Sequence, residues 1–140
     1  MIDAASDELV QQLDLLSIAA RIENGRYDPV SREVDSLELA RAVDPGASGT
    51  GASVQVEPEA LERSLAALVR AASRHGGVEA RLAVDGGRVT VEPVTAAAAP
   101  VVLGEELKDL GAAVAIRVVR ATGGTVELDG GRLTVTLPVR

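Results

Sequence analysis

The amino-acid sequence predicts an α+β fold in which helix, hairpin, helix and hairpin follow one another along an antiparallel sheet. Apolar residues recur at helical spacing after Pro58 and again between Glu106 and Ala121. Each stretch is followed by alternating apolar and polar residues around an identical turn, Asp85–Arg88 first and Asp129–Arg132 second. These Asp-Gly-Gly-Arg turns supply glycines for the positive φ angles of a tight hairpin.

Composition restricts both the core and the available chemistry. Phe, Trp and Cys are absent from the 140 residues, and Tyr27 and His75 are single. The core must therefore be built from Ala, Val and Leu, and disulfides, thiolate metal sites and cysteine nucleophiles are excluded. A lone histidine also lacks the partners that zinc clusters and nucleophilic triads need. We expect neither catalytic nor metal-ligating residues.

The charge of the chain limits its partners. A formal net charge of −7 argues against nucleic acid and anionic membranes, because both bind basic surfaces. The N-terminus lacks the pattern of a secretory signal, and no apolar run approaches the ~20 residues of a membrane span. We therefore expect a cytoplasmic protein.

The first part of the chain predicts a helix and a connector. Apolar residues at helical spacing predict a helix over Asp3–Asn24, whose stripe consists of Leu9, Leu13, Leu16 and Ala20. The acidic stretch Asp35–Val43 is compatible with one or two helical turns. Proline, glycine and serine then predict a loop over Pro45–Ala52, which is the expected domain boundary.

The remaining elements follow in order. Val54 and Val56 predict a short strand, and Pro58 suits the first residue of a helix with the apolar stripe Leu61, Leu65, Leu68, Val69 and Ala72. Alternating residues then predict strands over 78–84 and 89–91. A second helix is expected over Glu106–Ala121, before strands over Thr125–Leu128 and Leu133–Leu137.

Several segments carry a resemblance to a known family. They are Val56–Leu61, Leu110–Ala115, Ala121–Val126 and Leu133–Pro138, which read VEPEAL, LGAAVA, ATGGTV and LTVTLP. In order and spacing they resemble the N-box helix, the glycine-rich G2 box, the helix exit and the closing strand of the ATP-binding domain of sensor histidine kinases. Upstream, Leu15–Tyr27 is similar to the end of the second helix of that family's dimerisation and phosphotransfer bundle.

The resemblance implies a two-layer α/β sandwich of the Bergerat (GHKL) type with an N-terminal helix. It divides the chain into a remnant of the dimerisation helix (1–27), a connector (28–52) and a degenerate histidine-kinase-like ATPase domain (53–140). No histidine lies between Met1 and Asn24. The phospho-acceptor of a kinase or of a related phosphotransferase is therefore missing from this segment.

The resemblance also identifies the positions that hold Mg·ATP in the family. The two N-box asparagines correspond to Ala67 and Ala71, and a methyl group offers Mg²⁺ no oxygen ligand. The adenine-reading Asp-x-Gly-x-Gly loop corresponds to Glu92–Ala97, which contains neither Asp nor Gly. Glu92 could accept a hydrogen bond from adenine, but Pro93 beside it fixes φ and removes a donor.

Acidic residues stand where the family has phosphate-binding glycines. Asp109 replaces the first glycine of the G2 box, Glu105 and Glu106 precede it, and Gly111 is kept. The lid is shortened to roughly Ala97–Glu106 and contains Ala-Ala-Ala-Pro. Because carboxylates repel a triphosphate, we expect no bound nucleotide or magnesium.

These substitutions predict a catalytically inactive histidine-kinase-like protein, a pseudo-kinase that acts as a regulatory or interaction partner in two-component signal transduction. Its expected contact surface is the stripe Leu9, Leu13, Leu16 and Ala20. This stripe would bind a histidine kinase, a response regulator or a second copy of the chain. The alternative is a divergent histidine kinase or ATPase that still binds adenine nucleotide with Mg²⁺, and a gene remnant without function also stays open.

Overall fold

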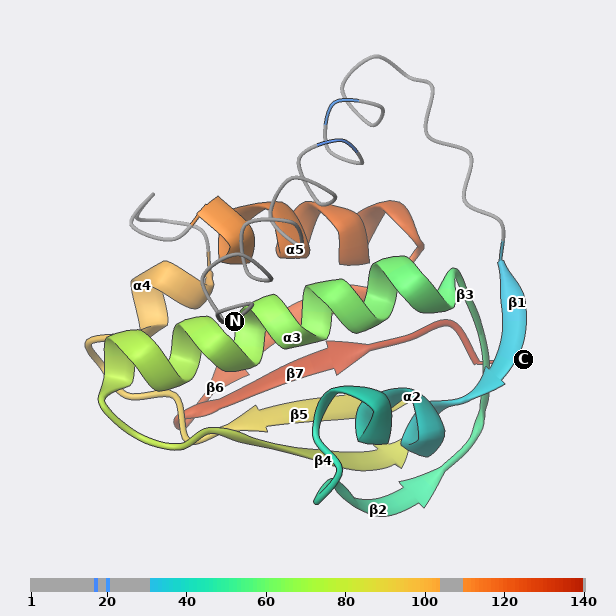
Figure 1. Ribbon diagram of the computed structural model, residues 1–140, viewed down its shortest axis with the longest axis horizontal. Helices are drawn as coiled ribbons and strands as arrows, with labels where there is room; N and C mark the ends of the chain where they lie inside the picture. Colours follow the sequence, from blue (N-terminus) through green and yellow to red (C-terminus); the bar gives the residue numbers. More distant parts are fainter. Residues whose placement is uncertain (1–16, 18–19, 21–30, 104–109, 140) are drawn as a thin grey trace, which may run out of the picture.

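The computed structural model describes residues 17, 20, 31–103 and 110–139 (Figure 1). Its helices are α2 (Ser36–Val43), α3 (Pro58–Gly76), α4 (Ala99–Val102) and α5 (Leu110–Ala121). Its strands are β1 (Arg32–Asp35), β2 (Ser48–Gly51), β3 (Ser53–Val56), β4 (Arg81–Gly86), β5 (Arg88–Glu92), β6 (Thr125–Asp129) and β7 (Arg132–Thr136). The predicted helix Asp3–Asn24 falls on residues outside this range, except that Ser17 and Ala20 are helical and exposed.

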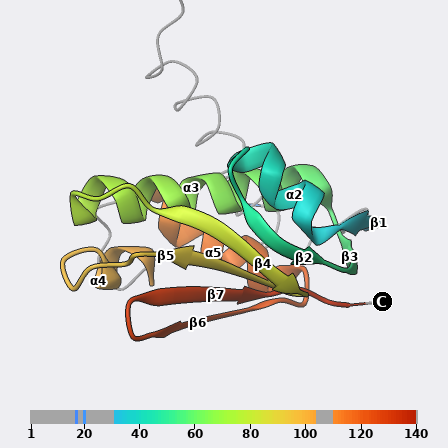
Figure 2. The same cartoon turned by 90° about the horizontal axis from the view of Figure 1, so that it is seen from below.

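A five-stranded sheet and a layer of helices form the two layers of the fold. The strand order is β2-β4-β5-β7-β6, with β2 parallel to β4 and the other neighbours antiparallel. Figure 2 shows α2, α3 and α5 on one side of this sheet. The predicted α+β, two-layer architecture is therefore confirmed, and the other face of the sheet carries no described helix.

The core lies between the two layers and is aliphatic, as composition predicts. Its fully buried larger side chains are Leu61, Leu65, Leu68, Val101, Val102, Val118, Val89, Val91, Leu133, Val54 and Val56. Along β5 the residues alternate, so Val89 and Val91 enter the core while Thr90 lies on the open face. No described helix is both long and apolar enough to cross a membrane.

Helix α3 forms as its sequence predicts. Pro58 occupies its first turn, where a missing N–H costs nothing. Gly77 ends the helix in the left-handed conformation, at φ 66°, and its N–H donates to the Ser73 carbonyl. Along its length two adjacent rows of small and branched residues are buried against the sheet and against α5, so α3 is the central element of the helical layer.

Both predicted hairpins are confirmed. Asp85 pairs with Arg88 in the first and Asp129 pairs with Arg132 in the second. In the second turn both glycines have positive φ, 57° and 81°, which explains why neither position carries a side chain. The second helix is described from Leu110 onward; residues 106–109, where it was also expected, lie outside the described range.

The segment Pro45–Ala52 is not the predicted loop. Its residues Ser48–Gly51 form β2, an edge strand that pairs in parallel with β4. Gly49 has φ 124°, and a Cβ at this position would overlap the Val84 carbonyl oxygen. Small residues are therefore required by close backbone approach, whereas in the sequence the same residues are typical of a turn.

Buried polar contacts fix the N-terminal part of the described chain to the sheet. Ser36 has no exposed surface, and its hydroxyl donates to the Gly86 carbonyl at 2.6 Å. The same oxygen accepts from the Ala52 N–H at 2.9 Å. Strand β1 pairs with β3 in a second, two-stranded sheet. The C-terminal end of the chain contacts this sheet, because the Gln55 N–H donates to the Pro138 carbonyl. Residues 32–56 thus pack as part of the same folded unit.

Candidate functional site

Ala67 and Ala71 lie inside the helical layer. Their exposed fractions are 2% and 0%. Val69 and Ser73, on the opposite side of α3, line a groove beside the end of α2. The two alanines therefore face away from α2, on the side where α5 runs beside α3 (Figure 1). Their methyl groups supply neither a metal ligand nor a hydrogen bond, and they allow close helix packing.

The first part of the expected lid is packed into the fold. Helix α4 contacts both α3 and α5. Its residues Val101 and Val102 have exposed fractions of 1% and 0%. Thr95 accepts backbone hydrogen bonds from Ala98 and Ala99 at 3.0 Å. Apolar side chains thus hold this segment against α3, whereas a phosphate-binding loop presents free backbone N–H groups. Residues 104–109 of the lid lie outside the described range.

Glu92 lies on the open face of the sheet. It ends β5 two residues after Thr90, so its side chain projects from the open face, away from the buried Val91. There its carboxylate accepts a hydrogen bond from Arg132 Nε at 3.3 Å. Both side chains are about half exposed, at 46% and 58%. Glu92 is therefore a surface ion-pair residue and does not face α3.

Gly111 is buried near the start of α5, where α5 packs against α3. A buried glycine in a helix permits close approach of neighbouring backbone. Asp109, together with Glu105 and Glu106, lies outside the described residues. The predicted acidic replacement of the phosphate contact at Asp109 is therefore still a prediction.

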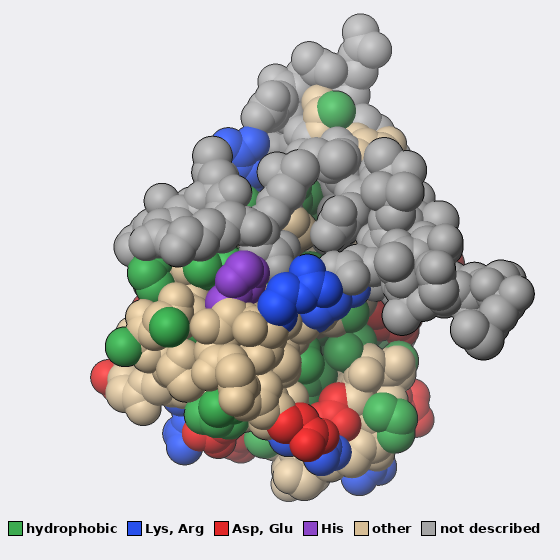
Figure 3. All heavy atoms as spheres, turned by 60° about the vertical axis from the view of Figure 1, so that its left-hand side comes forward, with side chains coloured by type: hydrophobic (Ala, Val, Ile, Leu, Met, Phe, Trp, Pro, Cys, Tyr) green, Lys and Arg blue, Asp and Glu red, His purple; other side chains and the backbone are tan. Residues whose placement is uncertain are grey.

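Metal-binding side chains do not gather in the described part of the chain. Residues 31–103 and 110–139 contain no group of three or more His, Asp or Glu residues placed to hold an ion. His75 is half-buried in the last turn of α3, where a cation suits the negative end of the helix dipole. Figure 3 shows basic side chains beside this histidine.

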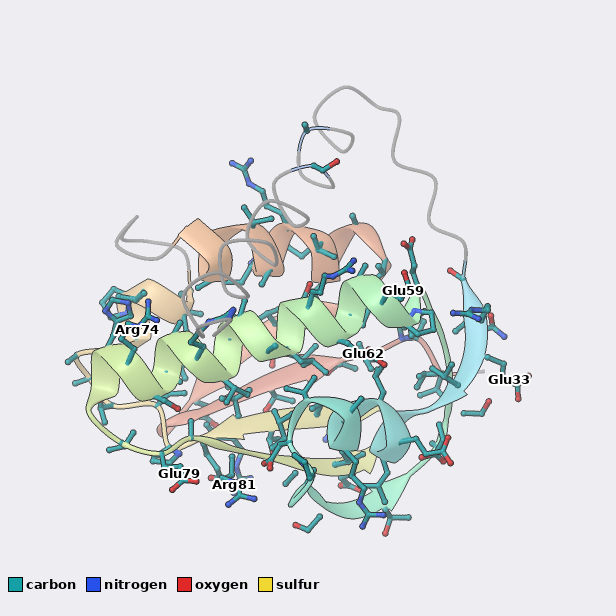
Figure 4. All side chains as sticks on the ribbon, viewed as in Figure 1. Glu33, Glu59, Glu62, Arg74, Glu79 and Arg81 are labelled. Carbon is teal, nitrogen blue, oxygen red and sulfur yellow. The ribbon has the colours of Figure 1, made fainter. Side chains whose placement is uncertain are left out.

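A carboxylate that the sequence motifs did not single out, Asp44, accepts four hydrogen bonds. Asp44, just after α2, accepts from Arg81 Nε and Nη2, both at 2.9 Å. The backbone N–H groups of Leu82 and Gly46 donate to it at 3.1 and 3.0 Å. The hydrogen bond from Arg81 is the main reason that the pKa of Asp44 lies below its usual value. This pair joins the end of α2 to β4, and Figure 4 shows Arg81 and Glu79 at that side of the sheet.

Three arginines on α3 form a second feature that the sequence motifs did not identify. Arg63, Arg70 and Arg74 are separated by seven and four residues, which places them on one side of the helix. Arg63 and Arg70 are half-buried and Arg74 is exposed, and Figure 4 shows Arg74 near the end of α3. This row runs beside the row that contains Ala67 and Ala71. The helical spacing alone would have been enough to find it.

Solved structures share this arrangement of sheet and helices. The histidine kinase AdeS of Acinetobacter baumannii superposes with a TM-score of 0.65 at 18% identity, over 96% of this chain and 78% of that one. The chain has the fold of a histidine kinase ATP-binding domain. The ATP-binding domain of PrrB from Mycobacterium tuberculosis gives a TM-score of 0.62 at 19% identity, over 79% of this chain and 98% of that domain.

A third histidine kinase structure shares the fold. The cytoplasmic segment of the histidine kinase QseC gives a TM-score of 0.66 at 12% identity, over 93% of this chain and 95% of that one. No family model matches the sequence, and no curated protein matches it significantly. The histidine-kinase-like fold is thus shared at identities too low to transfer a catalytic activity.

Proposed function

We propose that this chain is a histidine-kinase-like protein without kinase or ATPase activity, which acts as a regulatory or interaction partner in two-component signal transduction. The observation that carries the proposal is the burial of Ala67 and Ala71 on the α5 side of α3. At these positions a nucleotide-binding domain of this fold needs polar side chains for magnesium. Two buried methyl groups cannot polarise or hold a phosphate.

Two further observations support the loss of nucleotide binding. Glu92 is turned to the open face of the sheet, so this residue at the end of β5, which could read adenine, is engaged with Arg132 instead. Val101 and Val102 fill space between α3 and α5 with apolar side chains. A protein with this fold that binds no nucleotide can still act by contact with another protein.

Thermal unfolding with and without Mg·ATP and Mg·ADP tests the loss of binding. A ligand at 100 times its dissociation constant stabilises a protein by about 2.7 kcal/mol, which raises the melting temperature by several degrees for a domain of this size. We expect no shift at millimolar nucleotide. The ATP-binding domain of a histidine kinase with intact asparagines, measured alongside, should shift and so validates the assay.

A divergent kinase or ATPase makes the opposite prediction. A magnesium-dependent rise in melting temperature, or hydrolysis of ATP above the buffer rate, would overturn the proposal. The interaction half of the proposal needs a separate measurement, because loss of nucleotide binding alone is equally expected of a chain without function. Association of the purified protein with itself, a histidine kinase or a response regulator is that measurement.

A further inference from the structure

Three arginines form a row along one side of α3. Arg63, Arg70 and Arg74 stand at positions i, i+7 and i+11, which fall within about 40° around the helix axis. The carboxylates of α3, Glu59 and Glu62, precede all three arginines. Each arginine takes part in at least one non-covalent interaction, so the row is not simply an unused surface.

The N-terminal segment, outside the described residues, contains a matching acidic row. Its sequence predicts a helix over Asp3–Asn24, and in such a helix Asp3, Asp7 and Asp14 stand at i, i+4 and i+11. These three positions also fall within about 40° of one another. The acidic row is therefore as well defined as the basic row on α3.

The two rows match when the helices run in opposite directions. From Arg74 back to Arg63 the intervals are four and seven residues, and from Asp3 forward to Asp14 they are also four and seven. We propose that the N-terminal segment docks antiparallel along α3, with Asp3 beside Arg74, Asp7 beside Arg70 and Asp14 beside Arg63.

Chain direction and length agree with this register. β1 pairs with β3, Arg32 opposite Val56, so the chain that follows the segment enters the fold next to the start of α3 at Pro58. Seven residues, 25–31, join the segment to Arg32, and the antiparallel arrangement is the one that needs the shortest connection. The 22 residues of Asp3–Asn24 would span about 33 Å, and the 19 residues of α3 span about 28 Å.

Docking through the acidic row leaves the leucine row of the segment for another contact. Leu9, Leu13 and Leu16 are centred about 130° around the helix from Asp3, Asp7 and Asp14. The inference goes beyond the proposed function and is independent of it, because it specifies a contact within one chain. If it holds, α3 presents the leucine row to a partner in a fixed orientation.

Disulfide trapping tests the register, and the absence of native cysteine makes the chain suitable for it. In the full-length protein, Asp7→Cys with Arg70→Cys should form an intramolecular disulfide on mild oxidation, seen as a faster monomer band without reductant. Asp7→Cys with Arg88→Cys is the control, because Arg88 lies on the open face of the sheet, opposite α3. The pair Asp14→Cys with Arg63→Cys repeats the test if Arg70→Cys fails to fold. An equal yield in the control, a disulfide-linked dimer alone, or no disulfide in either correctly folded pair would overturn the proposal.

Charge reversal then tests whether the carboxylates and arginines hold the segment. In the Asp7→Cys, Arg70→Cys background, Arg63→Glu with Arg74→Glu should lower the rate of disulfide formation about tenfold. Adding Asp3→Arg with Asp14→Arg should restore it, because the same pairs form with opposite sign. Since exposed ion pairs are screened by salt, 0.5 M NaCl should also slow the unreversed variant. A rate that is unchanged by the arginine reversal, or not restored by the compensating reversal, would show that these charges do not set the register.

Discussion

Ala71 has no exposed surface and lies where α3 packs toward α5, so it has no space for a larger polar side chain. Ala71→Asn would add volume to a packed core and bury an amide group without a hydrogen-bond partner. We expect it to destabilise the fold by about 2–4 kcal/mol. It should not create nucleotide binding, since the loop after β5 still lacks an adenine-reading carboxylate on the helical side.

Urea unfolding followed by circular dichroism measures this change, and melting with Mg·ATP measures binding. Ala66→Asn is the matched control: Ala66 is on the same helix but half-exposed, and its substitution should cost less than about 1 kcal/mol. If Ala71→Asn is as stable as wild type and melts higher with Mg·ATP, the site is more open than its burial indicates.

Asp44 should make the free energy of unfolding depend on pH in a direction that its lowered pKa predicts. Its pKa is lowered in the fold, mainly by the hydrogen bond from Arg81, relative to the ordinary value of 3.8. A carboxyl with a lowered pKa contributes stability above its unfolded pKa and loses that contribution as the pH falls through the folded value. Asp44→Asn should therefore cost about 1–3 kcal/mol at pH 7 and much less at pH 3.

Paired urea titrations of wild type and Asp44→Asn at pH 7, 5 and 3 check this. The difference between the two proteins should be constant from pH 7 to 5 and shrink below pH 4. Asp129→Asn, in an exposed turn, is the control and should change stability little at pH 7. A difference that is just as large at pH 3 would assign the effect of Asp44→Asn to shape rather than charge.

At the scale of elements, local patterns predicted most of the fold. Pro58 and the leucine stripe define α3, and the two Asp-Gly-Gly-Arg turns define both hairpins, because helix caps and tight turns depend on residues only a few positions apart. β2 could not be found in this way. Its residues Ser48–Gly51 gain strand geometry only from the backbone of β4, more than thirty positions later.

The sequence names positions for the candidate site, and their geometry depends on the fold. The order of segments located Ala67 and Ala71, and burial of both is what an alanine in the middle of α3 should show. The side of the sheet on which Glu92 lies depends on strand register, which shifts every side chain to the other face when it changes by one residue. Asp44 and Arg81 are joined by packing of α2 on β4, and no local pattern connects them.

Gly49 tests whether β2 is held by close backbone contact. Gly49→Ala would place a methyl group against the Val84 carbonyl and force alanine to φ 124°. We expect it to cost about 1–3 kcal/mol from the backbone conformation alone, and more from the contact. Thr50→Ala is the control, because Thr50 lies in the same strand, is exposed and already carries a Cβ.

Amide hydrogen exchange measures the effect where it should occur. In Gly49→Ala the amides of Ser48–Gly51 should lose protection, whereas the hairpin β6–β7 at the other edge of the sheet should keep it. Wild-type protection of β2 in the variant would contradict the parallel pairing with β4.

At the scale of the whole molecule, the leucine row of the N-terminal segment is the predicted partner contact. Leu13→Asp with Leu16→Asp should abolish association while the melting temperature of the rest of the protein changes little, because an isolated amphipathic helix contributes little stability on its own. Light scattering across a concentration series measures the assembly. Ser17→Asp is the control on an exposed position of the same segment. A monomer at every concentration, together with global unfolding by the double substitution, would make these leucines part of the core.

The parallel pairing of β2 with β4 also has a consequence for the order in which the chain folds. The hairpins β4–β5 and β6–β7 close short loops, whereas β2 can join its neighbour only after α3, which lies between them in the sequence, has crossed the sheet. Closing a long loop costs more chain entropy and slows contact formation. We therefore expect pulse-labelling during refolding to protect the two hairpins first and β2 after them, so that the edge of β4 is uncovered during part of folding.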